Sequence, residues 1–199
     1  MDFGWLVEPF IFHKQEDVLK IAKILNQFDS EWSDYTFRQN NYFVHRHTST
    51  IPVTEFDAIN WESETYKQNS VLGFNYKPVL NNKKLLDLVV PIFDYLRVIH
   101  NGEIAKSMFV KLRAGKNIDE HSDAGLYLNT TKRHHIPIIT NDEVWFYVDG
   151  CKKNLRQGEI WQIDNSKLHK VENPSNEDRV HLIVDVIPNF CIGKPPIIY

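Results

Sequence analysis

Apolar residues recur at two different periods along this chain, and the period changes near Gly102. Residues 13–28 and 82–100 repeat apolar positions every three or four residues, which is the spacing of one helical face. After Gly102, short alternating segments separated by turn residues replace that spacing. The pattern predicts two helices in the first half of the chain and a run of strands in the second.

The stretch between and around the two helices is less regular. Residues 1–13 are rich in aromatics and are expected to be extended. Asn41–Thr48 and Ser49–Val53 carry Thr, Val and aromatic residues, which predicts two strands. Pro91 must start a new helix or kink the helix over 82–100, because proline lacks the amide hydrogen and clashes with the preceding turn. Asn101-Gly102 is a helix stop.

The second half of the chain predicts an all-β core. Its expected strands are Ser107–Arg113, Val144–Val148, Ile160–Ile163 and Val180–Ile187, and its expected turns are Ala114–Asn117, Asp149-Gly150 and Gln157-Gly158. Trp145 and Trp161 are expected in the core. Many short strands at this spacing suggest a sandwich or a barrel, and a double-sheet, cupin-like jelly roll (a double-stranded β-helix) fits best, within a mainly β fold with flanking helices (α+β).

Length and composition fit one domain of 199 residues, with 42% hydrophobic and 13% aromatic content. Residues 1–102 would support the core, 103–190 would form it and 191–199 would be a tail. A net charge of -3 favours neither nucleic acid nor an anionic membrane. The sequence shows no apolar run of spanning length and no secretory signal at its start. Cys151 and Cys191 are too few for a disulfide framework, so we expect reduced thiols and a cytoplasmic location.

The candidate chemistry begins at His121-Ser122-Asp123. Residues i and i+2 of a strand point to the same side, so His121 and Asp123 can aim at one point. His169, from a distant strand, would complete a 2-His-1-carboxylate triad, which holds Fe(II) on one face and leaves its other positions open. Arg179, ten residues after His169, is then placed to take a carboxylate through a two-pronged contact.

These residues could also have structural or surface roles. His121 and Asp123 could form a surface turn, and Arg179 could be a surface partner of Glu177 or Asp178. Further polar residues are expected to be structural or exposed: His134, Asp164, Ser166, His181 and Asp185.

A second histidine pair, in His45-Arg46-His47, also looks like a metal pair. Polar alternation on an exposed strand face explains it as well, because no third ligand follows at sensible spacing. Arg46 is retained as a candidate for a substrate carboxylate.

Three segments together carry a resemblance to a known family. They are Arg133-His134-His135-Ile136-Pro137-Ile138, Asp164-Asn165-Ser166 with His169, and the strand that Arg179 opens and that ends Val184-Asp185-Val186-Ile187-Pro188. From Met108 to Pro188 the chain resembles the aspartyl/asparaginyl β-hydroxylases, which are Fe(II)- and 2-oxoglutarate-dependent dioxygenases on a double-stranded β-helix. The bacterial proline hydroxylases belong beside them.

The resemblance implies roles for the residues that match. His121 and His169 would be iron ligands, and Arg179 would pair with the distal carboxylate of 2-oxoglutarate. His135, together with Arg133, would line the same pocket. The implied reaction consumes 2-oxoglutarate and O2, releases succinate and CO2, and hydroxylates an unactivated C–H bond.

Asp123 departs from part of that family. The vertebrate aspartyl hydroxylases that share these motifs lack an acidic ligand at this position, so this chain is more similar to the members with a full triad.

The substrate could be a free amino acid, an amino-acid-like metabolite or a peptidyl residue. Two alternatives are another metal-dependent cupin, such as an isomerase or thiol dioxygenase, and a non-catalytic binding jelly roll. The sequence does not indicate an oligomeric state.

Overall fold

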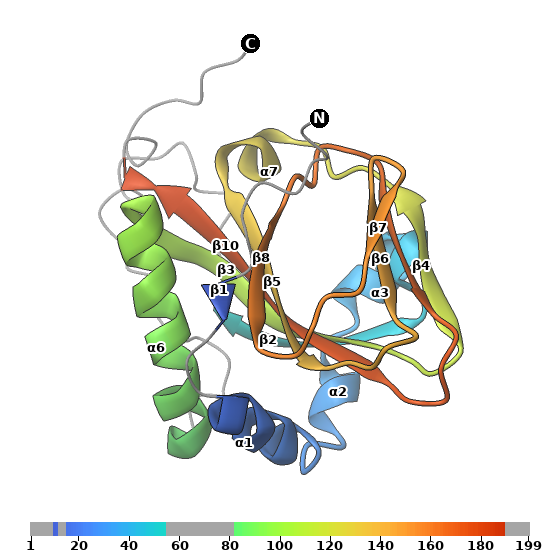
Figure 1. Cartoon of the computed structure of the whole chain (residues 1–199), viewed down its shortest axis with the longest axis horizontal. Helices are drawn as coiled ribbons and strands as arrows, with labels where there is room; N and C mark the ends of the chain where they lie inside the picture. The colour runs from blue at the N-terminus through green and yellow to red at the C-terminus, as the bar shows by residue number, and fades with distance from the viewer. Residues whose placement is uncertain (1–9, 12–14, 55–81, 190–199) are drawn as a thin grey trace.

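Strands dominate the computed structural model, which describes residues 10–11, 15–54 and 82–189. They pair, all antiparallel, into two sheets that face each other (Figure 1). The larger sheet has the order β1 (Phe10–Ile11), β8 (Glu159–Ile163), β5 (Lys132–Ile139), β10 (Arg179–Pro188), β3 (Gly102–Leu112), β2 (Thr48–Thr54). The smaller has the order β4 (Lys116–His121), β9 (His169–Asn173), β6 (Trp145–Val148), β7 (Cys151–Lys153).

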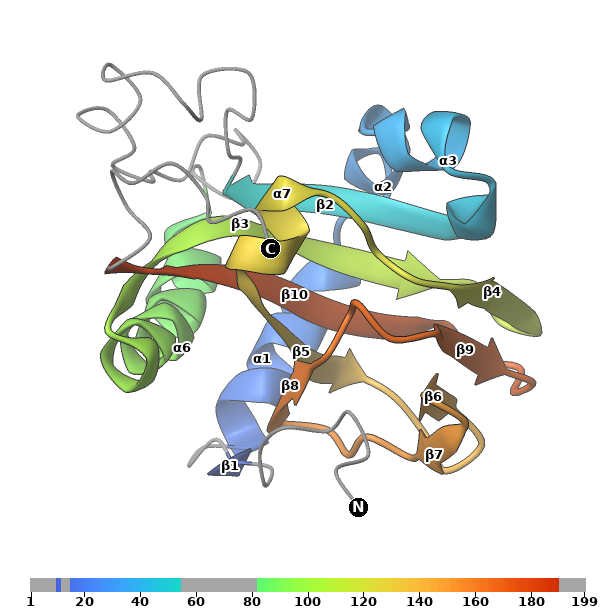
Figure 2. The same cartoon turned by 90° about the horizontal axis from the view of Figure 1, so that it is seen from above.

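Helices cover the outer face of the larger sheet. Helices α1 (Gln15–Leu25) and α6 (Lys83–His100) lie against it, while α2 (Glu31–Asp34) and α3 (Phe37–Asn41) lie beside β2 (Figure 2). A 3-10 turn, η1 (Phe43–His45), leads into β2, and a short helix α7 (Leu126–Thr130) joins β4 to β5. None of the helices within the described residues is long and apolar enough to cross a membrane.

Strand β10 shows how the two faces of the larger sheet differ. All ten of its residues are buried. Val180, Leu182, Val184 and Val186 belong to the apolar core shared with α1 and α6. Alternation turns the other residues of the strand, which include Arg179 and Asp185, toward the smaller sheet. The outer face of the larger sheet therefore packs its apolar residues against the helices, whereas polar side chains lie on its inner face.

The predicted fold class is confirmed, and most predicted elements are present. The Asp149-Gly150 turn joins β6 to β7 with both residues at positive φ, 50° and 76°, as a two-residue hairpin requires. Gly158 has a φ of 81°, and the turn before β4 contains Gly115 at a φ of 65°. Asn101 ends α6 in the left-handed conformation.

Several expected boundaries are wrong. Residues 41–47 do not form a strand: they contain the end of α3 and the η1 turn, and β2 begins at Thr48. Helix α6 continues through Pro91, so Pro91 does not start a new helix; it lies on the exposed side of α6. Strand β3 begins at Gly102, five residues before the predicted start, and α7 was not anticipated.

Some expectations lie outside the described residues. These are the extended conformation of residues 1–9 and 12–13, the start of the first helix at His13, and the tail with Cys191. Cys151 is a free cysteine on β7.

Candidate metal centre

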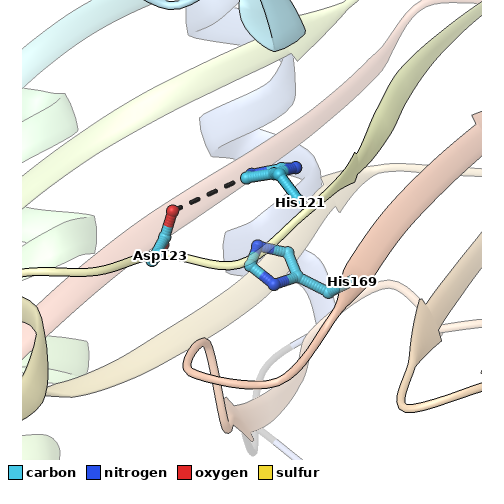
Figure 3. Close-up of side chains that lie close together, drawn as sticks. All are labelled: His121, Asp123 and His169. Carbon is cyan, nitrogen blue, oxygen red and sulfur yellow. Dashed lines mark ion pairs between the residues drawn. The ribbon is translucent and has the colours of Figure 1, made fainter.

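His121, Asp123 and His169 converge in the structure. Their potential ligand atoms all lie within 4.8 Å of one another. His121 ends β4 and His169 begins β9, and the two strands pair so that these residues are direct neighbours. Asp123 follows on the loop after β4, with its Oδ1 3.8 Å from His121 Nε2. Figure 3 shows the three side chains turned toward one another.

Backbone carbonyl groups orient both imidazoles. His121 Nδ1 donates to the Asp119 carbonyl at 2.7 Å, and His169 Nδ1 donates to the Lys167 carbonyl at 2.9 Å. A proton on Nδ1 leaves the Nε2 lone pair of each ring free to bind a metal, and such outer hydrogen bonds are typical of metal-binding histidines. Burial, the largest effect, lowers the pKa of His169, which favours the neutral ring that a metal needs.

Asp123 is held by a cation from the opposite sheet. Arg133, on β5, donates to Asp123 through Nη1, and its Nε and Nη2 donate to the two oxygens of Asp185 at 2.8 Å each. Burial would raise the pKa of Asp123, but the charges of Arg133, His169 and His121 and a hydrogen bond from Asn165 outweigh it, so the pKa is lowered. The carboxylate is therefore ionised and aimed at the two histidines.

Arg179 is a buried cation without a carboxylate partner in the described part of the chain. Only 1% of its surface is exposed, which rules out the surface ion pair with Glu177 or Asp178. Nη2 donates to His181 Nδ1 at 2.6 Å, and Nε has no hydrogen-bond partner among the described residues. Burial, followed by the charge of Arg38, lowers the pKa of Arg179 to about 9, so it is still cationic at neutral pH. A buried, unpaired guanidinium of this kind is suited to an anionic ligand.

The pocket that contains the three converging residues also contains Arg179. It encloses about 470 Å³, a volume that includes the open solvent at its mouth. The Arg179 guanidinium lies 5.9 Å from the Phe146 ring centroid, and the Phe146 ring stacks with that of His169 at 6.4 Å. Arg179 is thus separated from His169 by the Phe146 ring.

His135 also faces this pocket, from the same side of β5 as Arg133. It is buried, and its Nδ1 has no hydrogen-bond partner among the described residues. Burial, followed by the charge of Arg179, holds the pKa of His135 well below its ordinary value. His135 is therefore a neutral ring with a free polar atom next to the unpaired arginine.

Two pocket residues were not identified as a pair from the sequence. Arg38, on α3, reaches the pocket and donates from Nη2 to His45 Nε2 at 3.0 Å. The His45 ring is 5.4 Å from that of His121, and burial lowers the pKa of His45 to about 2. The expected exposed strand at 45–47 is therefore wrong for His45, which is buried in a 3-10 turn. Nothing in the local sequence pattern distinguishes Arg38 from a surface arginine.

Arg46, the sequence candidate for substrate binding, lies elsewhere. Its Nη1 donates to Asp119 at 2.6 Å, its guanidinium stacks 4.0 Å over Phe43, and it does not line the pocket. His47 is half-buried and also lies outside the pocket lining. The structure therefore does not bring His45 and His47 together at one site.

The remaining polar residues have structural contacts. His134 points away from the pocket and meets His100 of α6, Nε2 to Nε2, at 2.8 Å. Asp164 accepts from the Ser166 backbone amide at 3.2 Å, as a turn residue does. Asp185 is fully buried against Arg133 and Tyr127. Trp161 is 5% exposed and lies in the core, whereas Trp145 is only partly buried.

The jelly roll thus brings together two histidines and a carboxylate that could hold a metal ion. A family model described as aspartyl/asparaginyl beta-hydroxylase matches residues 11–188. The chain therefore belongs to the aspartyl/asparaginyl β-hydroxylase family, and it is a cupin-fold hydroxylase. No curated protein matches the chain.

The chain is similar to several solved structures. An oxidoreductase of the 2OG-Fe(II) oxygenase family from Burkholderia pseudomallei is 12% identical, with a TM-score of 0.46, over 70% of this chain and 66% of its own. A non-heme monooxygenase in a nickel complex is 12% identical, with a TM-score of 0.49, over 93% and 74%. A predicted oxalate decarboxylase from Thermotoga maritima is 20% identical, with a TM-score of 0.34, over 46% and 72%.

Proposed function

We propose that this hydroxylase depends on Fe(II) and 2-oxoglutarate. It would act on a C–H bond of an amino acid, an amino-acid-like metabolite or a peptidyl residue, with release of succinate and CO2. The observation that carries the proposal is the unpaired, buried Arg179 in the same pocket as His121, Asp123 and His169. Metal binding alone does not require a buried, unpaired arginine in the same pocket, whereas an anionic cosubstrate would pair with it.

The donor set fits a divalent iron ion. Two neutral imidazoles and one carboxylate would hold it from one side, with Nε2 of each histidine and an oxygen of Asp123 as ligand atoms. When bound, iron and 2-oxoglutarate supply the oxidising chemistry, and O2 supplies the inserted oxygen. The protein contributes position, charge and exclusion of water.

Each pocket residue then has a task. Arg179 would bind the distal carboxylate of 2-oxoglutarate in a two-pronged contact, with the free Nδ1 of His135 as a second polar group for the same ligand. Arg133 already contacts Asp123 and Asp185, so in this proposal it positions the Asp123 ligand instead of touching the cosubstrate. The apolar walls, among them Phe146 and Ile183, would keep water from the reacting atoms.

The test is the visible spectrum of the protein under anaerobic conditions. Fe(II) and 2-oxoglutarate together should give the weak charge-transfer band of the chelate, and neither alone should give it. His121→Ala should give no band, because it removes a ligand. If the protein binds metal but shows no band when 2-oxoglutarate is added, 2-oxoglutarate is not its cosubstrate. That result would favour the cupin isomerase or thiol dioxygenase alternative.

The substrate can then be sought by turnover. Succinate release is measured across free amino acids and short peptides, with mass spectrometry to detect an added oxygen. A cytoplasmic location and a small-molecule or peptide substrate are part of the same proposal. A substrate-stimulated release of succinate with no oxygen gained by any compound would contradict a hydroxylase.

A further inference from the structure

Arg38 is a second pocket cation that the proposed chemistry leaves unused. It lies on α3, in the N-terminal part of the chain, and extends to the inner side of the larger sheet. Nη2 donates to His45 Nε2 at 3.0 Å, and Nη1 contacts Met108 Sδ at 3.5 Å. Neither partner is an anion. No described carboxylate pairs with Arg38, whereas Arg133 pairs with two.

This cation persists at neutral pH. Burial, followed by the charge of Arg133, lowers the pKa of Arg38 to about 10, and a guanidinium with that pKa is still protonated near pH 7. A partly buried cation without an anion has an unfavourable free energy of desolvation. A pocket that keeps it in this state is suited to a ligand that supplies the missing negative charge.

Arg38 and Arg179 are linked to the three converging residues through different neighbours. Arg38 is connected through His45 to His121, with the last two rings 5.4 Å apart. Arg179 is connected through Phe146 to His169. A ligand carboxylate on Arg179 therefore leaves Arg38 available on the His121 side.

Counting charges leads to the same conclusion. Asp123 and Asp185 together offset Arg133 and one charge of a divalent metal. The two carboxylates of 2-oxoglutarate would offset the second metal charge and Arg179. Arg38 is then the one cation of this group without a counter-charge, so a third carboxylate completes the balance.

We propose that Arg38 binds a carboxylate of the prime substrate, with His45 as the hydrogen-bonded residue that positions its guanidinium. This inference rests on the proposed function and narrows its substrate class to compounds with a carboxylate near the C–H bond that reacts. The carboxylate can be the α-carboxylate of a free amino acid or the side-chain carboxylate of an acidic residue in a peptide. Arg46, paired with Asp119 outside the pocket, is not needed for this task.

The first experiment measures carboxylate binding without turnover. The protein is loaded with Mn(II) under nitrogen and saturated with 2-oxoglutarate, and acetate is added as the probe. Relaxation of the acetate methyl protons by the metal reports acetate held in the pocket. We expect a saturable effect in the wild type, a loss of affinity of at least tenfold in Arg38→Gln and a smaller loss in Arg38→Lys, which keeps the charge but not the planar donors.

Arg156→Gln is the matched control, because Arg156 is an exposed arginine paired with Asp142 far from the pocket lining. It should bind acetate as the wild type does. Circular dichroism of each variant checks that the fold is retained. The proposal is overturned if acetate causes no saturable relaxation effect in the wild type at concentrations that leave 2-oxoglutarate bound. It is overturned as well if Arg38→Gln binds acetate as tightly as the wild type does. It is also overturned if Arg46→Gln, and not Arg38→Gln, loses acetate.

The second experiment separates the two sources of the carboxylate. Succinate release is compared for free amino acids, for their amides and for N-acetyl-aspartyl amide, which keeps only a side-chain carboxylate. We expect acids to stimulate release and the matching neutral amides not to do so. Arg38→Gln should raise KM for the stimulating acid at least tenfold and leave KM for 2-oxoglutarate unchanged. Equal stimulation by an acid and its amide contradicts the proposal, and if no compound stimulates, the acetate measurement decides.

Failure of the cosubstrate assignment would look different. In that case 2-oxoglutarate would give no chelate band, while acetate binding could still be measured in an Arg179→Gln background. Acetate affinity that depends on Arg38 there would keep the carboxylate site and reject only the 2-oxoglutarate chemistry.

Discussion

The three pocket arginines differ in their partners, and the partner decides what each can bind. Arg133 donates to both Asp123 and Asp185, so it holds the Asp123 carboxylate in place. Arg179 and Arg38 each donate to a neutral histidine, His181 and His45 respectively, which leaves their charge uncompensated. A neutral imidazole orients a guanidinium without removing its attraction for an anion.

Arg179→Lys tests the geometry of the deeper arginine. Lysine keeps the charge but loses the two-pronged contact, so KM for 2-oxoglutarate should rise more than KM for the prime substrate. Arg179→Ala should cost about 2–5 kcal/mol of 2-oxoglutarate binding. Steady-state kinetics and an anaerobic titration of the chelate band measure both effects. Metal affinity should stay nearly unchanged, and a normal 2-oxoglutarate dependence in Arg179→Ala would reject the assignment.

The residue-level expectations came from motifs. They predicted that His121, Asp123 and His169 lie close together, and the structure places them so, although Asp123 lies on the loop after β4 and not on the strand that the i, i+2 spacing assumed. The sequence could not identify Arg38, because its place in the pocket depends on how α3 packs beside β2 and not on any local pattern. The partners of Arg133 were equally hidden, since Asp185 lies 52 residues away along the chain.

At the scale of elements, hydrophobic alternation was a better guide than strand propensity. The turns at 149–150 and 157–158 and the last long strand followed from alternation and turn residues. The wrong strand over 41–48 followed from its content of Val, Thr and aromatics. In the structure Tyr42 and Phe43 are exposed, at 53% and 73%, so those aromatics do not face a core and the segment turns instead. Propensity without a buried face did not decide the structure.

Gly102 tests the pairing of β3 with β10 in the larger sheet. A Cβ on Gly102 would overlap the Ile187 carbonyl oxygen, so Gly102→Ala must push the two strands apart at that end. We expect a loss of about 1–3 kcal/mol in the free energy of unfolding, measured by urea denaturation. Gly115→Ala is the comparison: its Cβ would meet no atom within 4 Å, and only its positive φ makes it unfavourable. Equal stability of Gly102→Ala and the wild type would contradict the close approach.

The contact between α6 and β5 predicts a pH dependence of stability. Burial lowers the pKa of His134 to about 3, and His100 and nearby Lys132 and Asp185 are the ionisable residues around this contact. The unfolded chain takes up a proton on His134 below about pH 6.5 while the folded chain does not. Above that pH, His134 is neutral in both states and its ionisation does not change the free energy of unfolding. As the pH drops from there toward 3, the free energy of unfolding falls by about 1.4 kcal/mol per pH unit.

His134→Gln removes this titration. The variant should be less stable than the wild type at pH 7.5, because it loses packing, but its free energy of unfolding should fall less between pH 6.5 and pH 5. Urea denaturation with a chelator present measures both proteins, and the difference between their slopes cancels the groups they share. Parallel slopes would mean that His134 is protonated in the folded protein.

At the scale of the whole molecule, the candidate metal centre connects the two sheets. His121 and His169 belong to the smaller sheet, on β4 and β9. Asp123 is tied through Arg133 on β5 to Asp185 on β10, both in the larger sheet. A metal bound by all three residues would therefore resist separation of the sheets.

Metal binding should consequently stabilise the entire fold and not only the loop that carries Asp123. A ligand that binds only the folded state at 100 times its Kd adds about 2.7 kcal/mol to the free energy of unfolding. For a chain of this length that corresponds to a rise in Tm of roughly 5–10 °C. Thermal unfolding of the wild type with Fe(II) under nitrogen, and again with excess chelator, measures the shift. His169→Ala should show almost no shift, whereas His47→Ala, which removes a histidine outside the pocket, should shift as the wild type does. An equal rise in Tm for His169→Ala would mean that the metal binds elsewhere on the protein, and the role of the three converging residues as ligands would have to be abandoned.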